Sequence, residues 1–91
     1  MKHNTATLSG LALDQAAHKA LGPELTGTCP NYSGNWAVGG PLIEFSKISI
    51  IERGVEGWAG DCSGAFSTGP TPLIAALRAL VASKFGDEVE L

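Results

Sequence analysis

The sequence predicts an α+β fold: an N-terminal helix, a long loop, a small antiparallel three-stranded meander, and a C-terminal helix packed on the sheet. Two apolar segments with the helical period predict the helices, and a β-branched segment between them predicts the first strand. With 91 residues, the chain has the length of a single domain, residues 1–91, with one modest core.

Residues 10–21 are predicted to form the first helix. Ser9 can cap its first turn through the side-chain hydroxyl, and Gly22 can end it. The apolar residues fall on one stripe of this helix, so Asp14 and His18 are expected on the opposite, solvent-exposed side.

Residues 24–40 are predicted to form a loop, because they are rich in turn-forming residues and follow neither the helical nor the strand period. A loop of this length usually either has a function or is held in place by packing of its own side chains. Tyr32 and Trp36 within it either pin the loop onto the core, which we favour, or form a binding surface beside glycines. After the loop, Pro41 favours a single helical turn over an extended edge segment.

Three strands are predicted at about residues 47–53, 56–61 and 65–67, separated by turns that contain glycine. One face of such an antiparallel meander packs on the helices, and the other faces solvent. We expect the inner face to hold Ile48, Ile50, Trp58 and Phe66.

Residues 72–85 are predicted to form the C-terminal helix. Thr71 can cap its first turn, Pro72 occupies the position where a missing N–H matters least, and Gly86 can take the left-handed conformation that ends helices. Because leucines and alanines fill nearly all its faces, the helix is either covered on more than one side or presents an alanine face to a partner. A homodimer through this helix is one such arrangement.

Arg78 is the only charge in the first three turns of that helix. We favour a side chain that lies along the surface with its guanidinium in water. The alternative is a buried or interface arginine that holds a carboxylate, of Glu44, Glu52 or a partner, through two parallel hydrogen bonds.

The charge distribution does not favour nucleic acid as a partner. The chain has six Lys and Arg against nine Asp and Glu, and the acidic excess lies in the C-terminal tail. No two cations are adjacent in sequence, whereas phosphate binding relies on clustered positive charge. Residues 1–7 and 87–91 are expected to be mobile ends.

No pattern of catalytic or metal-binding residues is present, so we expect neither an enzyme nor a cofactor or metal site. Cys29 and Cys62 are far apart and lack a C-x-x-C partner, and the histidines lack ligand spacing. A carboxylate beside a thiol disfavours the reactive thiolate, so Asp61 next to Cys62 makes a poor nucleophile site. No segment approaches the about 18 apolar residues that span a bilayer, so we expect no membrane association, and reduced thiols in the cytoplasm.

Three blocks of the sequence together resemble the small phage and prophage family whose lambdoid members are called NinX. They are residues 8–22, residues 32–44 with Tyr32, Trp36 and Glu44, and residues 69–90 with Arg78. The resemblance implies a bacteriophage or integrated-prophage origin and action in the host cytoplasm. It brings no known activity, cofactor or catalytic residue.

The resulting hypothesis is a phage or prophage accessory protein that binds another protein, through the aromatic loop or the alanine face of the last helix. The candidate binding residues are Tyr32, Trp36, Glu44 and Arg78. A small-molecule or peptide-binding module that uses Tyr32 and Trp36 is the alternative. A weak nucleic-acid binder would need Lys47, Arg53, Arg78 and Lys84 on one face.

Overall fold

The computed structural model describes residues 2–22 and 29–91, and it confirms the predicted α+β fold. The helices are α1 (Gly10–Leu21), α2 (Trp36–Phe45) and α3 (Pro72–Phe85). The strands β2 (Ser49–Glu52), β3 (Trp58–Cys62) and β4 (Ala65–Gly69) form an antiparallel sheet, and β1 (Lys2–Asn4) pairs with β5 (Glu88–Glu90). Two single 3₁₀ turns cover Thr5–Thr7 and Gly54–Glu56.

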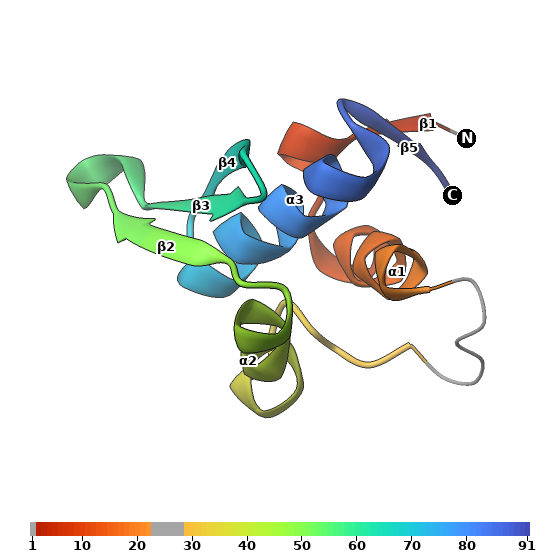
Figure 1. Cartoon of the computed structure of the whole chain (residues 1–91), viewed down its shortest axis with the longest axis horizontal. Helices are drawn as coiled ribbons and strands as arrows, with labels where there is room; N and C mark the ends of the chain where they lie inside the picture. The colour runs from red at the N-terminus through yellow and green to blue at the C-terminus, as the bar shows by residue number, and fades with distance from the viewer. Residues whose placement is uncertain (1, 23–28) are drawn as a thin grey trace.

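The centre of the fold is α3, which lies between the sheet on one side and α1 on the other (Figure 1). Its N-cap and C-cap are those predicted: Thr71 Oγ1 accepts a hydrogen bond from the N–H of Ile74, and the N–H of Gly86 donates to Ala82. The alanines Ala75, Ala76 and Ala79 are completely buried inside the molecule. The alanine face therefore belongs to the core, which corrects the expectation that it serves a partner or a homodimer.

The sheet packs on α3 through its smallest residues. A Cβ atom added to Gly60 in β3 would lie 2.7 Å from the carbonyl oxygen of Ala75, so the two backbones are nearly in contact. Directly paired residues of a sheet point to the same face, and Gly60 pairs with Ile50 and Ser67. These three side-chain positions therefore face α3.

One predicted member of the inner sheet face is wrong. Phe66 pairs with Asp61, the residue after Gly60, and neighbouring residues of a strand point to opposite faces. Phe66 therefore lies on the outer face, where it is 51% exposed. The guanidinium of Arg53 lies 5.9 Å from the centre of its ring. Ile48 is buried before β2 begins, and Ile50 and Trp58 are half-buried.

The loop predicted for residues 24–40 is wrong over its last five residues, and the single turn predicted at Pro41 is part of a longer helix, α2. Asn35 begins α2 by accepting a hydrogen bond from the N–H of Ala37. Gly39 has low helix propensity, but a Cβ atom there would collide with the carbonyl of Tyr32, so packing selects glycine in this helix. Residues 23–28 of the predicted loop lie outside the described residues.

The ends predicted to be mobile are paired. Lys2–Asn4 and Glu88–Glu90 form an antiparallel ladder, and Thr5 donates through its hydroxyl to the carbonyl of Gly86 at 2.8 Å. The alternation of the last strand points Val89 into the core, where it is 2% exposed, while its two glutamate neighbours face solvent. Burial of this one valine and the ladder bonds tie the two ends together (Figure 1).

We expect Val89→Ser to lower the free energy of unfolding by about 2 kcal/mol, because a buried apolar side chain is replaced by a small polar one. Glu88→Ser, at the exposed neighbouring position, is the matched control and should change it by less than about 0.5 kcal/mol. Urea denaturation followed by circular dichroism measures both. Equal stability of the two variants would mean that the C-terminal strand does not pack as described.

Candidate functional site

The structure distributes the four candidate residues over three places. Trp36 and Glu44 lie on the same exposed side of α2. Tyr32 is buried beside α1, and Arg78 is half-buried in α3. Only the first two are therefore brought together at the surface.

Tyr32 connects the segment before α2 to α1. Its hydroxyl is hydrogen-bonded to Nδ1 of His18 at 3.0 Å, and the two rings are stacked with centroids 6.0 Å apart. Asp14, one helical turn before His18, accepts a hydrogen bond from the N–H of Ser33 at 2.8 Å. Asp14 is 4% exposed and His18 is half-buried, so the expectation that both face solvent is wrong. They face the segment 29–33, which covers this side of α1.

This cluster contains no activated nucleophile. Burial raises the pKa of the Cys29 thiol, and the nearby Asp14 carboxylate adds to the rise. Burial also raises the pKa of the Tyr32 hydroxyl, with further contributions from Cys29 and Asp14. Both groups are therefore protonated at neutral pH, and the hydrogen bonds of the cluster hold the segment 29–33 against α1.

Within residues 2–22 and 29–91, Arg78 binds backbone carbonyls and no carboxylate. Its Nε donates to the carbonyl of Leu8 at 2.7 Å, and its Nη1 donates to the carbonyl of Thr68 at 2.9 Å. Burial lowers the pKa of the guanidinium. The sequence interpretations named a head group in water or a bond to a carboxylate. The guanidinium instead bonds two carbonyls, of Leu8 and Thr68, on segments that flank α3, and neither Glu44 nor Glu52 is its partner.

The exposed side of α2 is the main apolar surface that contains candidate residues. We call it the α2 surface, and its members are Trp36, Ala37, Pro41, Glu44 and Phe45. At 100° per residue these five positions occupy about half of the helix circumference, with Glu44 near the middle. Trp36 is 55% exposed and Phe45 is 77% exposed, whereas Gly39 on the opposite side is buried against the Tyr32 backbone and Leu73.

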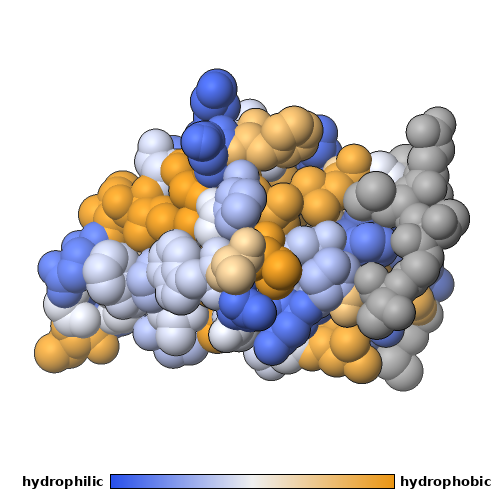
Figure 2. Space-filling view, turned by 90° about the horizontal axis from the view of Figure 1, so that it is seen from below, coloured by the Kyte–Doolittle hydropathy of each residue, from blue (hydrophilic) through white to orange (hydrophobic). Residues whose placement is uncertain are grey.

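Figure 2 shows the molecule from the side on which α2 lies in Figure 1. Hydrophobic residues reach the surface in several separate places and alternate with polar ones. Other exposed apolar residues belong to different elements, such as Val55 in the turn between β2 and β3, which is fully exposed. Single exposed side chains of this kind are ordinary on a protein surface, whereas α2 carries two exposed large aromatics within ten residues.

Sequence reasoning missed Phe45 as a surface residue. The helix that contains Phe45 was not predicted, although the sequence carries its signals. Asn35 is a favourable N-cap, and Val38, Leu42 and Ile43 have the spacing of one buried helical face. Reading that signal would have placed Phe45 with Trp36 on the opposite face. The glycines and the proline within the segment obscured it.

The family model described as "Bacteriophage P22, NinX" matches residues 26–84. The chain belongs to the NinX family. A comparison with curated proteins finds no match. The matched range contains α2, the three-stranded sheet and all but the last residue of α3. The α2 surface therefore lies within the part of the chain that this NinX-family protein has in common with the family.

No helix within residues 2–22 and 29–91 is long and apolar enough to cross a membrane. In the same ranges, no three His, Cys, Asp or Glu side chains are grouped so that they could hold a metal ion.

Proposed function

We propose that this NinX-family chain is a phage or prophage accessory protein that acts in the host cytoplasm by binding another protein through the α2 surface. The observation that carries the proposal is the exposure of Trp36 and Phe45 on a ten-residue helix whose only charge is Glu44. Tryptophan and other large aromatics supply much of the energy of protein interfaces, and the centres of such interfaces are poor in charge.

The α2 surface also indicates the chemistry of the partner. Trp36 and Phe45 lie at the two edges of the α2 surface, so an apolar groove that encloses about half of the helix would receive both rings. The carboxylate of Glu44, between them on the same face, would lose its water on binding, which is costly unless a partner cation or N–H group replaces it. The partner is therefore expected to present an apolar groove with an Arg, a Lys or a hydrogen-bond donor near its middle.

The backing of α2 supports a rigid binding surface. Gly39 brings the helix against the backbone of Tyr32, and Tyr32 is in turn hydrogen-bonded to His18 of α1. Asn35 fixes the first turn, and the N–H groups of Ser46 and Ile48 bond the carbonyls of Leu42 and Ile43 at the last turn. A surface held in this way loses little conformational entropy when it binds.

The other two hypotheses have less support. Tyr32 is buried, and neither it nor Trp36 lines either of two cavities found among the described residues, so a small-molecule site between the two rings is not supported. For a nucleic-acid surface, Arg78 is poorly suited because two of its donors, on Nε and Nη1, already bind the carbonyls of Leu8 and Thr68.

The proposal is tested by placing a photo-crosslinking amino acid at Ala37 in the α2 surface and, as a control, at Val55 in the distant β2–β3 turn. Both positions are exposed, so neither substitution should disturb folding. In phage-infected host cells we expect a discrete crosslinked protein from position 37 that is absent from position 55. The same crosslinks from both positions, or none from position 37, would contradict the proposal. A crosslink to a second copy of this chain would identify the partner as the chain itself.

A further inference from the structure

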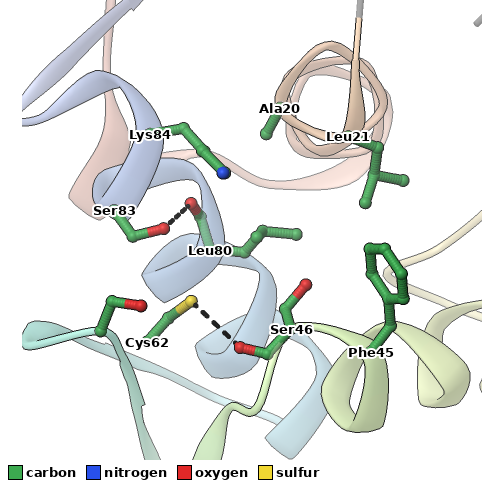
Figure 3. Close-up of a pocket in the computed structure, with 9 residues that line it drawn as sticks. Ala20, Leu21, Phe45, Ser46, Cys62, Leu80, Ser83 and Lys84 are labelled. Atoms are coloured by element: carbon green, nitrogen blue, oxygen red, sulfur yellow. Dashed lines mark hydrogen bonds between the residues drawn. The ribbon is translucent and has the colours of Figure 1, made fainter.

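A cavity of about 250 Å³ lies where the C-terminal ends of α1, α2 and α3 come together (Figure 3). Residues from these three helix ends and from the β3–β4 turn line it: Ala20, Leu21, Phe45, Ser46, Cys62, Ser63, Leu80, Ser83 and Lys84. Nothing in the α2 surface requires this cavity, although Phe45 forms part of both.

The polar part of the cavity is open to solvent: Lys84 and Ser63 are exposed and Ser46 is half-buried. Lys84 points toward the space between α1 and α3, and the Ser46 hydroxyl points up into it (Figure 3). Among the described residues, neither the ammonium of Lys84 nor the hydroxyls of Ser46 and Ser63 have a hydrogen-bond or ion-pair partner. Of the residues that the structure describes, no Asp or Glu lines the cavity, although the chain as a whole carries a net charge of −3.

At the ends of α2 and α3, several carbonyls accept hydrogen bonds from groups other than the Lys84 ammonium and the Ser46 hydroxyl. At the end of α2, backbone N–H groups bond the carbonyls of Leu42, Ile43 and Glu44, and the Cys62 thiol lies 3.7 Å from the carbonyl of Ser46. In α3 the Ser83 hydroxyl donates to the carbonyl of Leu80 at 2.7 Å. Lys84 and Ser46 are therefore left with donors directed at the cavity.

The opposite part of the cavity is apolar. Leu21 and the ring of Phe45 lie next to each other at one side, and the Leu80 side chain extends toward them across the floor (Figure 3). An apolar wall facing a lysine and a hydroxyl matches a ligand with an anionic head and a short apolar body. A volume of 250 Å³ is slightly below the usual range for small-molecule sites, about 300–1,000 Å³, so the ligand must be small.

We propose that this cavity binds an apolar monocarboxylate, with the carboxylate on Lys84 and Ser46 and the apolar body against Leu21, Phe45 and Leu80. A charge-assisted hydrogen bond from the ammonium supplies the orientation, and burial of the apolar body supplies much of the affinity. The same chemistry is offered by a free short-chain acid and by the C-terminal residue of a peptide that ends in an apolar side chain.

The test is an NMR titration of the ¹⁵N-labelled protein with octanoate and, separately, with octanol. We expect octanoate to cause saturable shifts at cavity residues, and octanol to bind at least about 10-fold more weakly because it lacks the charge. Lys84→Gln should weaken octanoate binding at least about 10-fold while leaving octanol unchanged. Lys47→Gln removes an exposed lysine that does not line the cavity, and should leave both affinities as they are.

A second variant tests the cavity without removing a charge. Ala20→Leu places a larger side chain in the wall and should abolish binding of both ligands, with the unaltered part of the spectrum showing that the fold is retained. The peptide Ac-Ala-Ala-Leu, with a free or an amidated C-terminus, then separates the two sources. Preferential binding of the free-acid peptide indicates a partner's C-terminus, and binding of octanoate alone indicates a small molecule.

The inference is overturned if neither octanoate nor the free-acid peptide gives saturable shifts below the micellar concentration of octanoate. It is also overturned if Lys84→Gln binds octanoate as well as the unaltered protein does. These titrations do not involve the proposed protein partner. Failure of the titrations would leave the α2 surface proposal unaffected. Failure of the crosslinking test would likewise leave the cavity proposal unaffected.

Discussion

Gly60→Ala is expected to lower the free energy of unfolding by about 3 kcal/mol, at the upper end of what overpacking a core usually costs. The added methyl group would lie 2.7 Å from the carbonyl oxygen of Ala75 and 3.1 Å from the Cα of Ala76. These are backbone atoms of the central helix, so no side chain can rotate away. The sheet or α3 would have to move, and the completely buried alanines of α3 would lose contacts with it.

A matched glycine separates this clash from a general effect of replacing glycine. A Cβ atom on Gly64 would meet nothing within 4 Å, but its φ of +89° disfavours other residues, so Gly64→Ala should cost only about 1 kcal/mol. Adding Ala75→Gly to Gly60→Ala should not restore stability, because the obstacle is the carbonyl. If Gly60→Ala unfolds at the same urea concentration as the unaltered protein, the sheet does not pack on α3 as described.

Arg78→Leu is expected to lower the free energy of unfolding by about 3 kcal/mol. The guanidinium joins the N-terminal segment at Leu8 to β4 at Thr68, and hydrogen bonds from a charged donor contribute about 1.5–3 kcal/mol each. Leucine would leave both carbonyls without this donor, although its own burial offsets part of the loss. Against a total stability of about 5–15 kcal/mol for a small domain, this is a large change.

Two controls define the role of Arg78. Arg78→Lys keeps the charge but has one ammonium group for two carbonyls, so it should recover about half of the loss. Arg53→Leu removes an exposed arginine whose Nη2 lies 4.0 Å from Oε2 of Glu56. It should lower the free energy of unfolding by less than about 1 kcal/mol. Unchanged or increased stability of Arg78→Leu would favour the original interpretation of a surface side chain with its head in water.

The sequence was most informative where local signals agree. The C-terminal helix could be predicted in full because Thr71, Pro72 and Gly86 delimit it and leucines follow its period. The sequence also indicated the turn at Ser63 and Gly64, but it did not indicate the strand register that this turn sets. Both residues have positive φ and form a two-residue connection that pairs Cys62 with Ala65, and this register places Phe66 on the outer face.

Contacts between distant parts of the chain could not be predicted. Nothing near Val89 indicates that Lys2–Asn4 is its pairing partner, and nothing near Arg78 indicates the carbonyl of Leu8. The candidate site shows the same limit. Trp36 and Glu44 were identified individually, but they share a surface only because Trp36–Phe45 is helical, and the packing of Gly39 on Tyr32 makes that helix favourable.

The measurement that tests the functional proposal most directly is the affinity of the purified partner, identified by crosslinking at position 37, for two single variants. Trp36→Ala should weaken binding at least about 10-fold, because it removes a large exposed aromatic from the proposed interface. Val55→Ala, an exposed apolar residue outside the α2 surface, should change it less than about 2-fold. Urea denaturation should show both variants to be as stable as the unaltered protein within about 1 kcal/mol. Equal affinities for Trp36→Ala and the unaltered protein would contradict the proposal that the α2 surface is the binding site.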